Sequence, residues 1–177
     1  MPTFNGWLSL RIACFVDRRV EVTYGQSVFS VDTRNHPAYY RYQARLAYEA
    51  ALAADKVVGH WPGYEIAAPP PVMTMCAPAI ELSLKACLLE NGIDERTVRK
   101  FGHDLVGCWG KCIEVGANPD LLDMKILAII SDLLVSGRLR YGEESDLGRV
   151  PVFGPLSTLV EASLALCGAP KVSDILS

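Results

Sequence analysis

The sequence lacks the excess of positive charge with which proteins attract nucleic acid or anionic lipid over long distances. Its 17 Lys and Arg residues are outnumbered by 20 Asp and Glu residues, so the formal net charge is −3. A global basic field is therefore excluded, and a local basic patch is the form of charge-based binding that stays open. Half of the 177 residues are hydrophobic and 21% are charged, which is typical of a globular protein and excludes a disordered chain.

Metal-ligand spacings are also missing. The six cysteines lie in apolar segments, at positions 14, 76, 87, 108, 112 and 167. The closest pair, Cys108 and Cys112, has a spacing of four, which places both thiols on one face of a helix. We therefore expect small buried thiols, with no metal and no cofactor.

No segment has the pattern of a signal peptide or a membrane span. The first fifteen residues contain no basic region, and Ser9 and Arg11 interrupt their apolar run. The densest apolar stretch, residues 121–135, contains three charged residues and is shorter than a bilayer requires. We expect a cytoplasmic protein with no membrane partner.

Apolar residues alternate with polar ones over residues 7–32, which is the pattern of strands. We expect a small antiparallel β hairpin or meander, with turns at Asp17-Arg18 and Gly25-Gln26. Residues 1–35 are therefore predicted to be an N-terminal β segment. Such a small sheet needs a packing partner to be stable.

The period becomes helical from Pro37, and residues 36–177 are predicted to form a bundle of four or five helices, so the fold class is mainly α. A first helix is expected over 38–58, and its connector, residues 59–72, ends in a tri-proline run expected to be extended. Further helices are expected over 74–90, 103–114, 118–137 and 155–168, the last being an extra C-terminal helix. A charged helical turn is expected over 94–101 and an irregular segment over 138–151.

The helix over 74–90 is apolar on two opposite sides. One stripe consists of Ala77, Ile80, Leu84, Cys87 and Leu88, and the other of Leu82, Ala86 and Leu89. Such a helix is central in its assembly, and one small bundle offers too little surface to cover both stripes. We therefore predict a homodimer formed through this helix or its neighbours.

Two aromatic groups give further predictions about burial. Trp109 shares the inward stripe of its helix with Leu105 and Ile113, so we expect it in the core. Three tyrosines of the first helix, Tyr39, Tyr40 and Tyr42, cannot all face inward, so at least one is exposed or at an interface.

The most distinctive pattern lies in residues 79–105. A helix with the sequence Ala-x-Glu-x-x-x-Lys-Ala and a glycine stop is followed by a short charged turn, and then Gly102-His103-Asp104-Leu105 opens the next helix. In these features the chain resembles HEPN domains, a family of helical bundles. The resemblance covers residues 38–142 and includes Arg140-Tyr141-Gly142.

The resemblance implies a four- or five-helix bundle that is often a homodimer. HEPN domains include RNase toxins and also non-catalytic modules that bind nucleotides or protein partners, among them antitoxins and nucleotidyltransferase-like proteins. Nuclease members carry an Arg followed after four to six residues by a His in a late helix. This chain has only His36, His60 and His103, so the late helix has no imidazole. Arg96 and His103 have six residues between them, which is the spacing of the nuclease motif. They lie, however, in the connector between the second and third predicted helices.

These observations lead to three hypotheses about function. We favour a non-catalytic binding module with a polar groove for a nucleotide, an RNA segment or a partner peptide. The second hypothesis is a metal-independent RNase of toxin type that uses Arg96 and His103. The third is a structural bundle that only pairs with another protein. The candidate ligand-binding residues are Glu81, Lys85, His103, Asp104, Arg138, Arg140 and Tyr141.

Each candidate also has a structural interpretation. His103 and Asp104 precede a helix, where they would cap free backbone N–H groups. The same helix start, with Arg99 and Lys100 nearby, would alternatively bind an anion. An intrahelical ion pair explains Glu81 and Lys85 equally well, and a groove would need both to converge on His103. Arg138 and Arg140 are typical of a solvated helix end.

Overall fold

The fold is given by a computed structural model that describes residues 19–24, 27–32, 37–141 and 148–170. It is mainly α-helical, as predicted. The chain divides into two compact units, Met1–Arg34 and Asn35–Ser177, and each is described by itself.

In the first unit, strands β1 (Arg19–Tyr24) and β2 (Ser27–Asp32) pair antiparallel, with Val22 opposite Phe29. The predicted turns at Asp17-Arg18 and Gly25-Gln26 include residues outside the described ones, as does the predicted strand before Asp17. The hairpin or meander as a whole therefore stays a prediction.

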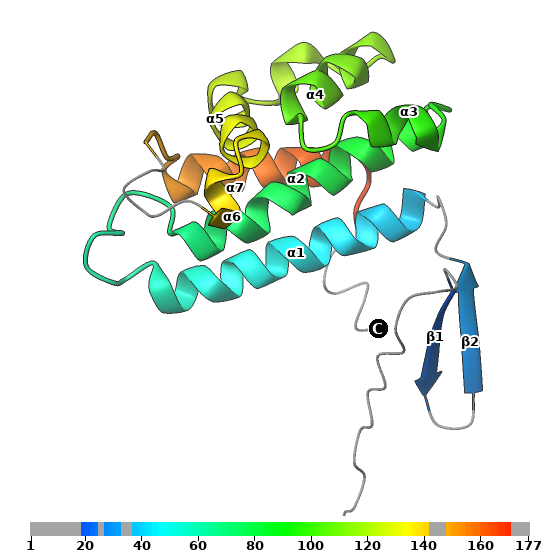
Figure 1. The fold of residues 1–177 in the computed structure, drawn as a ribbon, viewed down its shortest axis with the longest axis horizontal. Coiled ribbons are helices and arrows are strands. Elements are labelled where there is room, and N and C mark those ends of the chain that lie inside the picture. Colours follow the sequence, from blue (N-terminus) through cyan, green and yellow to red (C-terminus); the bar gives the residue numbers. More distant parts are fainter. Residues whose placement is uncertain (1–18, 25–26, 33–36, 142–147, 171–177) are drawn as a thin grey trace, which may run out of the picture. The chain divides into compact units, whose positions relative to one another are not determined.

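The second unit is built around one helix, α2, which has neighbours on several sides (Figure 1). Helix α1 runs along one side of α2, and α7 and α4 pack on other sides. The helices are α1 (Pro37–Val58), α2 (Pro70–Glu90), α3 (Glu95–Lys100), α4 (Leu105–Glu114), the 3-10 turn η1 (Pro119–Leu121), α5 (Met124–Val135), α6 (Arg138–Tyr141) and α7 (Phe153–Leu166).

The start of α2 differs from the prediction. Pro70 and Pro71 are helical, with Pro69 as the residue before the first turn, so the tri-proline run is not wholly extended. Proline suits this place because first-turn N–H groups have no partner within a helix and the ring presets the helical φ. The C-terminus is as predicted, with Asn91 as the cap and Gly92 at a φ of +79°.

Helix α2 is covered within the single chain. Ala77, Ile80 and Leu84 are fully buried, as is Ala86 of the opposite stripe. Leu82 and Leu89 pack against the same core. The surplus apolar surface from which we predicted a homodimer is therefore not on α2, and the homodimer itself stays a prediction. By length and composition α2 would also pass for a membrane span, but 61% of its apolar window is buried inside the structure.

The core on the other side of α2 is formed by α4 and α5. Trp109 is fully buried, as predicted, together with Leu105 and Cys112. Its indole Nε1 is also buried and has no hydrogen-bond partner among the described residues.

Two boundaries in the second half were predicted wrongly. Asn118-Pro119-Asp120 forms the η1 turn, and α5 begins only at Met124, because Asp123 caps it by accepting hydrogen bonds from the N–H groups of Lys125 and Ile126. Arg138–Tyr141, predicted to be irregular, is the short helix α6. The predicted C-terminal helix is α7, which ends just before Gly168, a residue with a φ of +60°.

The connector before α2 is tied to the segment before α7. The N–H group of Ala68 donates to the carbonyl oxygen of Pro151 at 2.9 Å, and Ala67 forms a β-bridge with Val152. Helix α1 is joined to α7 through Tyr48, whose hydroxyl lies 2.6 Å from that of Ser157. These contacts fix how α7 sits against α1 and α2.

Candidate functional site

The structure brings Glu81, Lys85 and His103 together. Lys85 Nζ donates to Glu81 Oε1 at 2.6 Å and to the carbonyl oxygen of Gly102 at 2.9 Å. His103 Nδ1 lies 2.9 Å from Glu81 Oε2. We call these three side chains the Glu81 cluster. The convergence that a polar groove required is therefore present.

Local sequence explains this geometry. Glu81 and Lys85 are four residues apart on α2, so both side chains lie on the same face of the helix. Gly102 has a φ of +55°, a backbone conformation that favours glycine, and it turns the chain between α3 and α4. This turn places His103 over α2 immediately before α4 begins.

Exposure differs sharply within the Glu81 cluster. The side chains of Glu81 and Lys85 are only 14% and 13% exposed, whereas that of His103 is 42% exposed. Glu81 accepts from two partners and Lys85 donates to two acceptors, so both are engaged inside the protein. His103 is therefore the member that a ligand reaches most easily.

The Glu81 carboxylate also orients the His103 ring. An ionised carboxylate only accepts hydrogen bonds, so Nδ1 carries the proton in this contact. In the imidazolium form both ring nitrogens are donors, so Nε2–H is left to donate a hydrogen bond to an anionic ligand. The arrangement is suited to hydrogen bonding at a fixed point above α2.

Asp104 acts as a helix cap rather than as a ligand-binding residue. Its carboxylate accepts a hydrogen bond from the N–H group of Gly107 at 2.9 Å and caps α4. His103 is not the cap, because its ring bonds to Glu81 instead. The capping interpretation therefore holds for one of the two residues.

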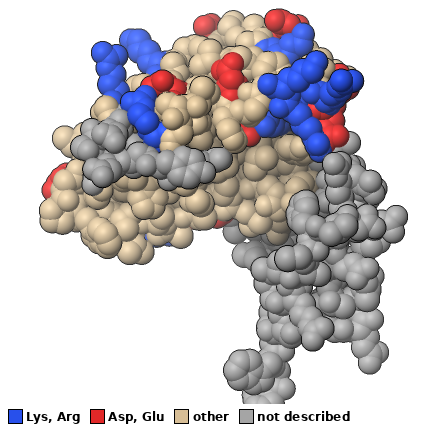
Figure 2. Space-filling model, in the orientation of Figure 1, with Lys and Arg blue, Asp and Glu red and all other residues tan. Residues whose placement is uncertain are grey.

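Three cationic residues of α3 lie close to His103 in the sequence. Arg99 pairs with the Glu95 carboxylate one turn earlier. Arg96 and Lys100 are exposed, and neither forms an ion pair with a described residue. Figure 2 shows Lys and Arg side chains gathered at the end of the helical unit where α3 lies. The region thus has a local excess of available cations.

The candidates from the end of α5 onward are not brought to this cluster by any described contact. Arg138 pairs with the Asp132 carboxylate, and its Nε donates to Ser136 Oγ at 3.0 Å. It is thereby held against the end of α5, as a helix-end residue is expected to be. The side chains of Arg140 and Tyr141 lie outside the described part of the chain.

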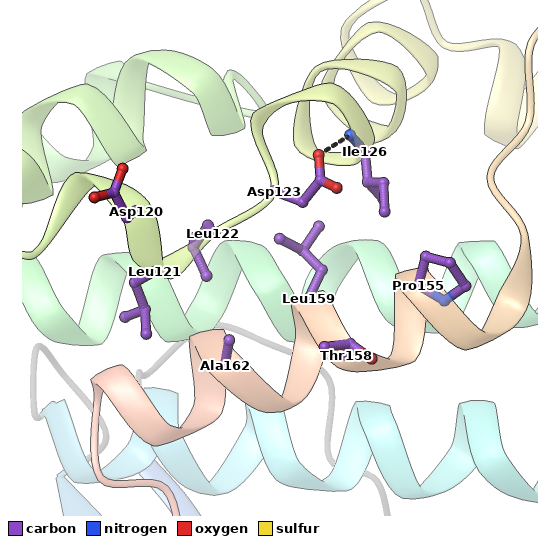
Figure 3. Close-up of a pocket in the computed structure, with 9 residues that line it drawn as sticks. All are labelled: Asp120, Leu121, Leu122, Asp123, Ile126, Pro155, Thr158, Leu159 and Ala162. Carbon is purple, nitrogen blue, oxygen red and sulfur yellow. Dashed lines mark hydrogen bonds between the residues drawn. The ribbon is translucent and has the colours of Figure 1, made fainter.

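A cleft that the sequence did not reveal lies between α7 and the start of α5 (Figure 3). It measures about 390 Å³, and its walls are mostly apolar. Ile126 and Leu159 reach into it from opposite sides, while Asp120 lies at one end. The Asp123 carboxylate turns back to cap α5. Asn118-Pro119-Asp120 was interpreted as a helix start, which concealed the turn that opens the cleft.

The described cysteines are all buried and free, as predicted. Burial raises the pKa of the Cys76 thiol from 9.0 to about 12. A hydrogen bond from Cys112 lowers the pKa of Cys87, while neighbouring thiols and burial raise that of Cys112. No group of three potential metal ligands occurs among the residues that the structure describes.

Comparison with protein-family models, with curated proteins and with solved structures finds no match to this chain.

Proposed function

We propose that this chain is a non-catalytic, HEPN-like binding module that holds a phosphate group of a nucleotide or an RNA segment at the surface of Arg96, Lys100 and His103. The observation that carries the proposal is the His103 ring, which is exposed yet fixed by the Glu81 carboxylate. A ring oriented in advance loses less conformational entropy when it binds a ligand. The HEPN-like pattern of residues 79–105 supports the same assignment.

The placement of the charges around α3 favours an anionic ligand. Residues 94–104 contain three cations and three carboxylates, so the segment has no net charge, but each carboxylate is turned to a partner within the protein. Asp94 and Asp104 cap helices, and Glu95 pairs with Arg99. Arg96 and Lys100 remain, four residues apart on one face of α3. Two cations and an imidazolium on neighbouring residues of the chain offer the positive charge and the N–H donors that bind a phosphate.

In this proposal Glu81 and Lys85 position the site and do not touch the ligand. Lys85 is too enclosed to reach a phosphate without losing both of its acceptors. It holds the Gly102 carbonyl and so fixes the backbone that carries His103. Phosphate binding therefore depends on Lys85 indirectly, because Lys85 positions His103.

The test is binding of a fluorescently labelled single-stranded RNA, and of ATP, at two salt concentrations. Lys100→Ala is expected to weaken RNA binding several-fold and to reduce the slope of log Kd against log salt by about one. Lys125→Ala is the matched control, because it removes an exposed lysine from the start of α5. Equal effects of the two substitutions would contradict a site at α3.

A second function is favoured by one observation. A histidine held by a carboxylate through Nδ1 is also the arrangement of a general base, so the Glu81–His103 contact is compatible with an RNase that uses Arg96 and His103. We expect no cleavage, since His103 is the one imidazole in the motif region. Incubation of the same RNA with wild type and with folded His103→Ala protein decides this. Cleavage by the wild type alone would replace the binding-module proposal.

A further inference from the structure

The cleft between α7 and the start of α5, which we call the α5–α7 cleft, is separate from the residues that carry the proposed function. Its volume of about 390 Å³ falls within the roughly 300–1,000 Å³ of pockets that hold small molecules. All of its lining residues belong to residues 120–126 or to α7, and Arg96, Lys100 and His103 are not among them. The cleft is therefore a second place at which this chain offers a site.

The sequence of α7 explains why this space is not filled from within the chain. Pro155, Thr158, Leu159 and Ala162 have the spacing i, i+3, i+4 and i+7, so they lie on one face of the helix and form one wall of the cleft. Three of these four side chains are short, which leaves room between α7 and the opposite wall. On that wall Leu121 stays 39% exposed, so a ligand with an apolar body would remove apolar surface from water.

The charged groups that line the α5–α7 cleft are both acidic. They are Asp120 and Asp123, and no Lys, Arg or His side chain lines the cleft in the described part of the chain. Lys125 is exposed and does not belong to the lining, and Glu161 of α7 pairs with Arg45. The local potential therefore favours a cation over an anion.

Asp123 has one carboxylate oxygen to offer to a ligand. Its Oδ1 accepts hydrogen bonds from the N–H groups of Lys125 and Ile126, at 2.8 Å and 3.3 Å. Its Oδ2 forms no hydrogen bond with the described residues, and Figure 3 shows it on the side of the cleft that Ile126 forms. The capping bonds hold the carboxylate in place, so it loses little conformational freedom when Oδ2 accepts from a ligand.

We propose that the α5–α7 cleft binds a small organic cation, whose ammonium group pairs with Asp123 and whose hydrocarbon or aromatic body packs between Ile126 and Leu159. An anion of the same shape would meet two carboxylates and no described cation. A peptide backbone would find few partners, because the Thr158 hydroxyl already donates to the carbonyl oxygen of Gly154. This inference goes beyond the phosphate site and does not depend on it, since the two sites share no residue.

The test compares three probes that share a phenyl ring and a two-carbon chain and differ in the end group. Phenethylamine has an ammonium group, phenethyl alcohol a hydroxyl group and hydrocinnamate a carboxylate. Each probe is titrated at about pH 7 into the isotope-labelled full chain, and the amide chemical shifts are followed by NMR. We expect a millimolar dissociation constant for phenethylamine, as for other ligands of this size.

The wild type is expected to bind phenethylamine about three- to fivefold more tightly than phenethyl alcohol, and hydrocinnamate more weakly than either. This ratio corresponds to an ion pair at the upper end of those formed by exposed groups, because the apolar walls reduce screening by water. The largest shifts are expected at residues 120–126 and 155–162, which contain the lining.

Asp123→Asn tests the ion pair without removing the helix cap, because asparagine caps helices about as well as aspartate. The variant is expected to bind phenethylamine and phenethyl alcohol within about twofold of each other. Asp94→Asn is the matched control, because Asp94 is also an exposed capping carboxylate but lies at the start of α3. It is expected to keep the preference of the wild type.

Ala162→Phe tests the space itself, because the larger side chain occupies the cleft, and all probes are expected to bind at least about fivefold more weakly. Ala128→Phe is its control, since Ala128 is exposed on α5 and does not line the cleft. Equal affinity of the wild type for the three probes, or a preference for phenethylamine that survives in Asp123→Asn, would overturn the ion pair. An absence of shifts up to about 20 mM phenethylamine, or binding that Ala162→Phe leaves unchanged, would overturn the site.

Discussion

The side chain of Trp109 shows how far a single residue could be placed from the sequence. The spacing of Leu105, Trp109 and Cys112 was sufficient to predict burial, because apolar residues three and four apart share one helix face. That the indole Nε1 meets no hydrogen-bond partner in the described part of the chain was not predictable, since this depends on which residues of other helices surround the ring.

Substitution of Trp109 tests both aspects of its environment. Trp109→Ala is expected to lower the free energy of unfolding by about 3–5 kcal/mol, the usual cost of truncating a large core side chain. Trp109→Phe is expected to cost much less, because it keeps an aromatic ring and removes no hydrogen bond. Urea denaturation followed by circular dichroism measures both. Equal losses would indicate that the N–H group has a partner after all.

The roles of some residues of the candidate site could be predicted from the sequence, and those of others could not. Glu81 and Lys85 follow from helical spacing, and Asp104 is a cap of the expected type. The meeting of His103 with Glu81 depends on the path of the chain through Gly102, which sequence periodicity does not describe. Arg138 was assigned to the ligand site but bonds to the neighbouring Asp132, because helix-end arginines reach carboxylates one or two turns away.

Helix boundaries were predictable at residues that mark only the end of a helix. They were missed at residues that are found both at the start of a helix and in irregular segments. Asn91-Gly92 ended α2 as expected, because glycine at positive φ stops a helix. Proline disrupts the interior of a helix but is favoured in its first turn. The tri-proline run was therefore assigned to the connector, although Pro70 and Pro71 are the first residues of α2. Pro119 likewise begins a 3-10 turn rather than α5.

The contact between α2 and the α3–α4 connector is expected to contribute measurably to stability. Lys85→Met removes two charge-assisted hydrogen bonds at a mostly buried position, so we expect a loss of about 1.5–3 kcal/mol. Lys111→Met is the control, because its pair with Glu114 is exposed and surface pairs contribute about 0–1 kcal/mol.

A double-mutant cycle with Glu81→Gln then isolates the pair. Because Lys85 and Glu81 contact each other, their combined cost is expected to fall short of the sum of the single costs by at least about 0.5 kcal/mol. Additive losses would mean that Lys85 acts through the Gly102 carbonyl alone.

The helical unit as a whole is expected to lose stability in alkaline solution. The pKa of Cys76 is near 12 in the folded chain and 9.0 when the thiol is exposed, so the unfolded chain releases a proton first. Between these two values the folded chain binds more protons, and its stability therefore falls as the pH rises. Burial also raises the pKa of Tyr48, which adds to the decline in the same direction.

Urea denaturation in reducing buffer, at about pH 7 and about pH 10, tests this prediction. One group contributes a slope of at most about 1.4 kcal/mol per pH unit above its unfolded-state pKa. Cys76→Ala is expected to be less stable near pH 7, because it removes a buried side chain, but to show a shallower decline. An unchanged slope would mean that Cys76 does not titrate in this range.

The tie between Ala67 and Val152 has a consequence for the order in which the chain folds. This bridge, with the hydrogen bond from Ala68 to Pro151, joins points that enclose α2 to α6 in the sequence. Closing so long a loop costs chain entropy that only the helices packed inside it can repay. The entrance to α2 is therefore fixed late, after α4 and α5 have packed on it, although α2 begins in the first half of the chain. During synthesis, residues 151 and 152 must leave the ribosome before the segment that leads into α2 acquires these neighbours.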